Sequence, residues 1–185
     1  MSTIHNINGD LAAGTAILQD DDQLPVYVAA DGVSKKLSGA LIRRGIGGVV
    51  NTSATTVSLS ATSHGNRLLV INTNSSSGCA VSLPAATGSG IKYEILNGIA
   101  QTQGSITVVC AGSDVMKGRA LSMDSSAVAT HQNVFVTLTA TTLTWNRTTT
   151  GGIGHDHATL WDGASGVWRV LVESQTSGDD ATPFS

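Results

Sequence analysis

The sequence predicts an all-β protein: an antiparallel β-sandwich or jelly-roll-like domain preceded by an extended N-terminal arm. Three observations favour this fold class. Apolar residues alternate with Ser and Thr over many short segments, Gly- and Ser-rich turns separate these segments, and helical periodicity is almost absent. Charged residues make up only 12% of the chain and aromatic residues 4%, so small and β-branched side chains must form most of the core.

The strand pattern is persistent from about residue 49 and predicts nine to eleven short strands. Residues 67–74 form a nearly continuous apolar run, and Pro84 ends the strand that begins at residue 79, because proline cannot donate to a ladder. Two hairpins are predicted. One joins residues 133–140 to 143–148, and the other joins 158–163 to 166–174. Many short strands at close spacing are typical of a sandwich or jelly roll.

We divide the chain into an N-terminal part, residues 1–48, a β domain, residues 49–173, and a polar tail, residues 174–185. The N-terminal part holds an acidic run at residues 20–22, a candidate strand at 25–30 followed by a turn, and a Gly-rich run at its end. It also carries four basic residues: Lys35, Lys36, Arg43 and Arg44. We interpret it as an extended arm with a hairpin and a linker. The alternative is a first pair of strands belonging to the main sandwich.

Charge and hydropathy argue against two classes of partner. The chain has ten Lys and Arg residues, thirteen Asp and Glu residues, and no strong basic cluster. Nucleic-acid-binding proteins, in contrast, need a dense basic surface. No apolar run reaches the 18 residues or so that a membrane span needs. No secretory signal is visible at the N-terminus, so we expect the chain to fold in a cytoplasm.

The two cysteines, Cys79 and Cys110, alternate with apolar neighbours in candidate strands. We predict that they are buried free thiols, as suits a reducing compartment. A disulfide between strands is the alternative. A catalytic thiolate is disfavoured, because neither cysteine has a basic or His neighbour.

The sequence predicts no enzyme and no cofactor. The motifs GxSxG, HExxH and Walker A are missing, and no GxGxxG lies between a strand and a helix. Asp156, Asp162 and Glu173 lie in the kind of region where paired carboxylates could hydrolyse glycosides. Because the chain has so few acidic residues, chance proximity explains them better.

Two further sequence patterns, a pair of histidines and a set of three tryptophans, are compatible with ligand binding. His155 and His157 would point to one side of an extended segment and could share a transition metal. A solvated loop is the preferred interpretation, so no metal ligand is predicted. The three tryptophans, Trp145, Trp161 and Trp168, could form a sugar-stacking platform, with the last two facing one another across a hairpin. Core or interface anchors are the preferred interpretation.

Residues 83–118 combine an LP-A turn, a Gly-rich loop, an ITVV strand and a Gly-Ser-Asp turn, and GVWRVL ends the later segment that contains Trp161 and Trp168. Over residues 50–173 this pattern resembles β-rich virion proteins of tailed bacteriophages, especially capsid decoration (cement) proteins and fibre shaft or head domains. The resemblance implies a structural homotrimer on the outer surface of the capsid, made in the host cytoplasm. It further implies that the protein binds the major capsid protein and stabilises the shell.

On this resemblance the arm lies across the coat, and the β domain faces outward. Lys35, Lys36, Arg43 and Arg44 would then pair with acidic coat residues, although a solvated arm explains them equally. Three arms on one trimer would strengthen binding through multivalency. The alternative function is a fibre or receptor-binding module that recognises host surface glycans, and a β-sandwich enzyme is the third hypothesis.

Overall fold

The computed structural model describes residues 23–28, 33–38, 48–125 and 132–185, and the chain divides into two compact units, Met1–Ile46 and Gly47–Ser185. In the first unit, β1 (Gln23–Val28) and β2 (Val33–Ser38) form a two-stranded antiparallel sheet. The predicted hairpin is therefore confirmed. Among the described residues, β1 and β2 pair with each other and with no other strand. The interpretation of residues 1–48 as an arm, and the alternative of a first strand pair in the main sandwich, both stay predictions.

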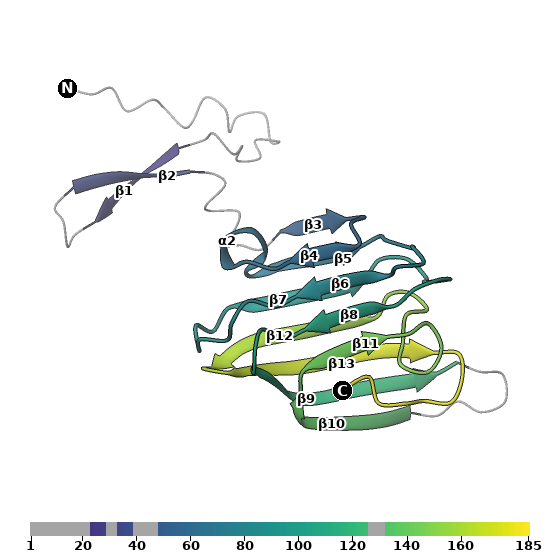
Figure 1. The fold of residues 1–185 in the computed structure, drawn as a ribbon. Coiled ribbons are helices and arrows are strands. Elements are labelled where there is room, and N and C mark those ends of the chain that lie inside the picture. The colour runs from purple at the N-terminus through teal and green to yellow at the C-terminus, as the bar shows by residue number, and fades with distance from the viewer. Residues whose placement is uncertain (1–22, 29–32, 39–47, 126–131) are drawn as a thin grey trace. The chain divides into compact units, whose positions relative to one another are not determined.

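The described part of the second unit contains eleven strands, as predicted, in two sheets (Figure 1). The seven-stranded sheet consists of β3 (Val49–Thr52), β5 (Arg67–Ile71), β7 (Lys92–Asn97), β9 (Val115–Asp124), β10 (Gln132–Ala140), β12 (His157–Ala164) and β13 (Val167–Thr176). The four-stranded sheet consists of β4 (Thr56–Ser58), β6 (Cys79–Ser82), β8 (Ile106–Val109) and β11 (Thr142–Trp145). A short helix, α2 (Ala61–His64), begins after the N-cap Ser60. The described residues include no helix that could cross a membrane.

Both sheets are mixed, so the predicted antiparallel arrangement is wrong. Between β3 and β8 the chain passes from one sheet to the other with each strand, and successive strands of one sheet run parallel. In the larger sheet, whose order is β10-β9-β13-β12-β7-β5-β3, β13 also pairs parallel with β9. An alternating apolar pattern reports that one face of a strand is buried, and it carries no information on strand direction.

Of the two predicted hairpins, one is confirmed. β12 and β13 pair antiparallel around the turn that precedes Val167, with Trp161 opposite Arg169. The other hairpin is wrong, because β10 lies in the seven-stranded sheet and β11 pairs with β8 in the four-stranded sheet. Thr141 is the crossing point, and its carbonyl accepts a hydrogen bond from Cys110 N.

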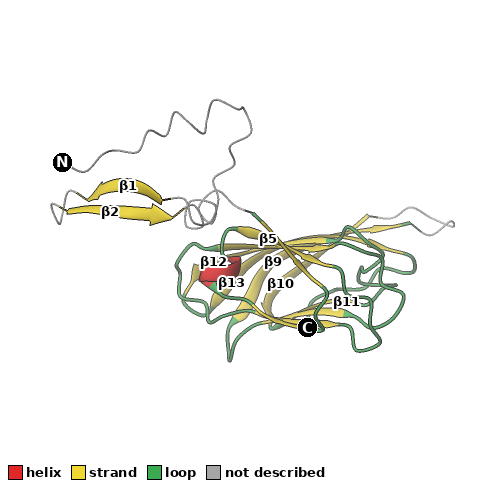
Figure 2. Ribbon diagram, turned by 90° about the horizontal axis from the view of Figure 1, so that it is seen from above, coloured by secondary structure: helices red, strands yellow, loops and turns green. Residues whose placement is uncertain are grey.

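Buried side chains from both sheets form one apolar cluster, so the sheets face each other across a common core (Figure 2). Trp145 and Trp168 lie within it. So do Cys79 and Cys110, which confirms the prediction of buried free thiols. Burial raises the pKa of both thiols, and with the nearby Asp114 carboxylate the pKa of Cys110 rises to about 11.

The polar composition of the segment after Glu173 predicts a tail that is mobile or ordered by a partner, whereas the structure attaches this segment to the second unit. β13 continues to Thr176, and Phe184 is buried and forms a bridge with Leu143 of β11. The Asp180 carboxylate accepts hydrogen bonds from the side chains of Ser122, Asn133 and Thr176. A polar segment can pack against this unit because its contacts are the hydrogen bonds of Asp180 and the buried ring of Phe184.

Candidate binding surface on the seven-stranded sheet

The Gly-rich loop at residues 84–90 is held by Asp162, which is only 3% exposed and lies beside a β-bulge in β12. Its carboxylate accepts hydrogen bonds from the backbone of Thr87 (2.8 Å), Gly88 (2.6 Å) and Ser89 (3.0 Å). The hydroxyls of Thr87 (2.8 Å) and Ser89 (2.6 Å) donate two more. Burial alone would raise the pKa of Asp162, but these hydrogen bonds outweigh it and hold the pKa far below its usual range.

Asp156, the central residue of the His-Asp-His segment, is also buried. Its carboxylate accepts from Asn97 Nδ2 (3.2 Å), Gly152 N (2.8 Å), Gly154 N (3.4 Å) and Gln175 N (2.7 Å). His155 has a positive φ of 63°, so the extended alternation that would align it with His157 is broken. Among the described residues, no group of three or more His, Cys, Asp or Glu is placed to hold a metal. The hydrogen bonds to the Asp156 carboxylate therefore fix the conformation of this segment.

The predicted partner-binding residues are only partly described. Lys35 and Lys36 lie on β2, in register with Val26 and Pro25 of β1. Arg43 and Arg44 lie outside the described residues. Their role in binding a partner stays a prediction.

The three tryptophans have different environments. Trp145 and Trp168 are buried, at 0% and 1% exposure, as predicted for core anchors, and the Trp168 ring centroid lies 5.6 Å from that of Tyr93. Trp161 is 37% exposed. The prediction that Trp161 and Trp168 face each other is wrong, because Trp161 pairs with Arg169 and lies on the opposite face of the sheet.

Trp161 forms one wall of an open groove of about 360 Å³ on the face of the seven-stranded sheet that points away from the core. We call it the outer-face groove. Its lining residues are Lys117, Gly118, Arg119, Val136, Trp161, Arg169, Val170 and Leu171. The pairing aligns them in rows: Trp161, Arg169 and Lys117 form one row across β12, β13 and β9. Leu171, Arg119 and Val136 form the next row, across β13, β9 and β10.

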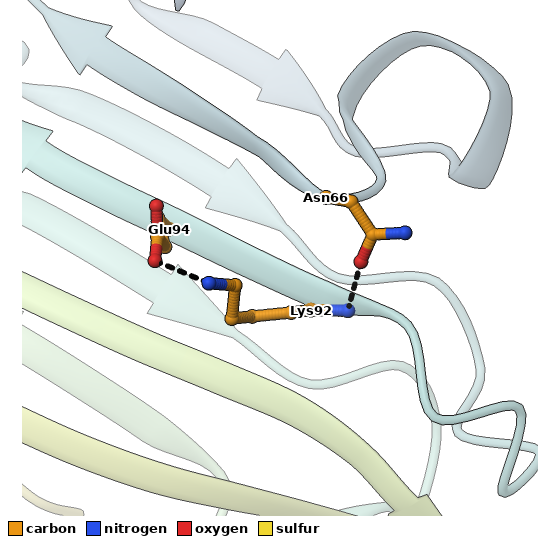
Figure 3. Close-up of polar contacts among 3 residues, drawn as sticks. All are labelled: Asn66, Lys92 and Glu94. Atoms are coloured by element: carbon orange, nitrogen blue, oxygen red, sulfur yellow. Dashed lines mark hydrogen bonds and ion pairs between the residues drawn. The ribbon is translucent and has the colours of Figure 1, made fainter. Parts of the chain in front are cut away.

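The outer-face groove is positively charged. Three of the six Lys and Arg residues in 47–185 line it. Lys92, which pairs with Trp161 from β7, is neutralised by Glu94, whose Oε1 lies 2.6 Å from Lys92 Nζ (Figure 3). The backbone of Lys92 is fixed by Asn66 Oδ1 (3.1 Å). The three groove cations have no such ion pair with any described acidic residue.

A second exposed feature of this sheet is its edge strand β10. Val134, Val136 and Leu138 are 61%, 70% and 66% exposed, while Thr137 and Ala140 of the same strand are buried. We call these three side chains the β10 strip. An exposed apolar edge strand favours pairing or packing with another chain. The alternating pattern of residues 133–140 predicted a strand correctly, but it does not reveal that the larger apolar residues of this strand face solvent.

Comparison with known proteins found no relative of this chain. No family model, curated protein or solved structure matches the chain. The features of the chain that bear on function are the outer-face groove, the β10 strip and the resemblance over residues 50–173.

Proposed function

We propose that this chain is a virion structural protein of a tailed bacteriophage. It self-associates as a homotrimer and decorates the outer surface of the capsid by binding the major capsid protein. The two facing sheets act as a β-sandwich knob, and the N-terminal unit acts as the attachment arm. The observation that carries this proposal is the β10 strip, because such a surface is suited to burial against another chain.

The β10 strip supports self-association for two reasons. β10 is an edge strand, so one side of its backbone has no partner strand within the described sheet and can pair with another chain. Its three exposed apolar side chains would each contribute about 1.5–3 kcal/mol if fully buried. The strip has none of the Lys or Pro residues that usually protect an edge.

The arm supports attachment to a larger surface. It contains a hairpin that forms its own sheet, and Lys35 and Lys36 lie on its second strand. These residues, with Arg43 and Arg44, would bind acidic groups on the coat. A trimer presents three arms, and joining three weak sites can raise the overall affinity by about 10²–10⁴.

This function is testable by cosedimentation with tailed-phage capsids that lack their decoration protein. The wild-type chain is expected to sediment with the capsids. A β10 variant, Val134→Lys with Leu138→Lys, should bind more weakly. Charge on the strip would prevent trimer formation, so each chain would bind the capsid through a single arm. An arm variant, Lys35→Glu with Lys36→Glu, should also bind more weakly, through loss of contacts with the coat.

The matched control is Thr56→Lys with Ser58→Lys, which adds the same charge to β4, the edge strand of the smaller sheet. It should sediment like the wild type. The proposal is wrong if the wild type does not bind any capsid tested. The arm assignment alone is wrong if the arm variant binds as well as the control.

One observation favours the alternative function, a module that recognises host surface glycans. The exposed indole of Trp161 lies in an open groove, as a sugar-binding platform requires. A decoration protein could carry such a site on its outward face, so the two functions are compatible.

A further inference from the structure

We propose that the outer-face groove binds a carboxylated sugar residue, a hexuronate or a sialic acid, within an acidic glycan. This goes beyond the decoration role, because it requires neither trimerisation nor a capsid. It specifies a ligand for the glycan-binding alternative. The inference depends on the juxtaposition of one exposed indole ring with three cations that no described acidic residue neutralises.

The indole supplies the first element of recognition. A sugar ring has an apolar C–H face that packs on an aromatic face, and the polar edge of the ring remains in water. Trp161 is exposed, whereas Trp145 and Trp168 are enclosed in the core, so it alone among the three can stack on a ligand. Leu171 extends the apolar surface in the neighbouring row, and its contribution does not depend on the β10 strip.

The cations supply the second element. Neighbouring strands lie about 4.8 Å apart, so Arg169 is one strand and Lys117 two strands from Trp161 in the same row. A carboxylate on a stacked sugar would reach the Arg169 guanidinium, which can bind it with two parallel hydrogen bonds. The stem of Arg169 passes over Gly163 in the β12 bulge, where even a Cβ would lie only 2.9 Å from Arg169 Cγ. The absence of a side chain at Gly163 therefore leaves room for the stem of Arg169, which lines the same groove as Trp161.

The shape of the groove favours a sugar over an acidic peptide. Its volume of about 360 Å³ is near the lower end of the usual range for small-ligand sites, about 300–1,000 Å³. β12, β13 and β9 are interior strands, so their backbone groups are already paired and cannot bind an extended peptide as an added strand. An acidic peptide would have only side-chain contacts there.

The test measures binding of the full chain to four polymers by calorimetry and by tryptophan fluorescence. Polygalacturonate and polysialate carry sugar carboxylates. Carboxyl-reduced polygalacturonate is neutral, and poly-Glu carries carboxylates on a peptide. We expect binding to one or both of the first two and not to the last two. Because Trp145 and Trp168 are buried, the fluorescence change should come from Trp161 and disappear in Trp161→Phe.

Two variants test the roles of the side chains. Arg169→Gln should weaken binding by about tenfold or more, because it removes the positive charge and at least one of the two hydrogen bonds to the carboxylate. Trp161→Ala should weaken binding more than Trp161→Phe, which keeps an aromatic face. The matched control Arg67→Gln removes one positive charge on β5, two strands from β12, and should bind like the wild type. Unfolding curves should be unchanged in Arg169→Gln, because this side chain is exposed.

The outcomes separate this inference from the proposed function. No binding to either acidic glycan, equal binding to carboxyl-reduced polymer, or equal binding to poly-Glu would each overturn it. Equal weakening by Arg67→Gln would show a general charge effect and would also overturn it. None of these results bears on capsid binding, because Val134 and Leu138, the residues changed in the β10 variant, do not line the groove.

Discussion

Asp162→Asn is expected to lower the free energy of unfolding by about 3 kcal/mol or more. The carboxylate accepts five hydrogen bonds from Thr87, Gly88 and Ser89 in a buried position. An asparagine has one acceptor oxygen and would present an NH₂ group to N–H and O–H donors, so several donors would lose their partner. Urea denaturation would measure the change. Asp179→Asn, at an exposed carboxylate, is the matched control and should change stability by no more than about 0.5 kcal/mol.

The same substitution makes a prediction for pH. Folding lowers the pKa of Asp162 from an ordinary value of 3.8, so its ionisation favours the folded state above that pH. The stability difference between wild type and Asp162→Asn should therefore be constant from neutral pH to about pH 5 and then shrink as the pH falls below 3.8. A difference that grows on acidification would contradict the assigned role of Asp162.

Gly118→Ala is expected to destabilise the protein by about 3 kcal/mol, the upper end of the usual cost of a steric conflict, because the added Cβ would clash with backbone. Gly118 lies in β9 opposite Val170 of the parallel strand β13, and a Cβ at this position would be 1.8 Å from the Val170 carbonyl oxygen. The clash involves backbone, so two central strands would have to separate. Thermal and urea unfolding would measure the loss.

The matched control for this prediction is Gly178→Ala, where an added Cβ meets nothing within 4 Å. It should be neutral or slightly stabilising, since alanine restricts the unfolded chain more than glycine does. If Gly118→Ala is as stable as Gly178→Ala, the parallel pairing of β9 with β13 is wrong.

The sequence predicted most strands but not their arrangement. The nearly continuous apolar run in residues 67–74 and the apolar residues in 158–163 identified β5 and β12, because buried strands need such residues in any sheet. The direction of β9 relative to β13 depends on contacts between residues about fifty positions apart. The hairpin predicted between residues 133–140 and 143–148 is wrong, because local sequence does not reveal that the chain changes sheet at Thr141.

The candidate sites were predicted less well than the strands. The sequence predicts Trp161 as a candidate ligand-binding residue, but it gives no such prediction for Lys117, Arg119 or Arg169, which line the same groove. The two segments that carry them meet only through the parallel pairing of β9 with β13. A local signal did exist, since Lys117 and Arg119 are two residues apart on a strand and must share a face. The predicted cations of the arm, by contrast, are close together along the chain, so local sequence is enough to identify them.

The most direct test of the proposed assembly is the mass of the full chain in solution by light scattering over a range of concentrations. We expect three times the chain mass of 18.8 kDa for the wild type and for Thr56→Lys with Ser58→Lys. Val134→Lys with Leu138→Lys should give a mass near 18.8 kDa, because the charged strip would resist burial. A wild-type mass of 18.8 kDa at every concentration would contradict self-association through the β10 strip.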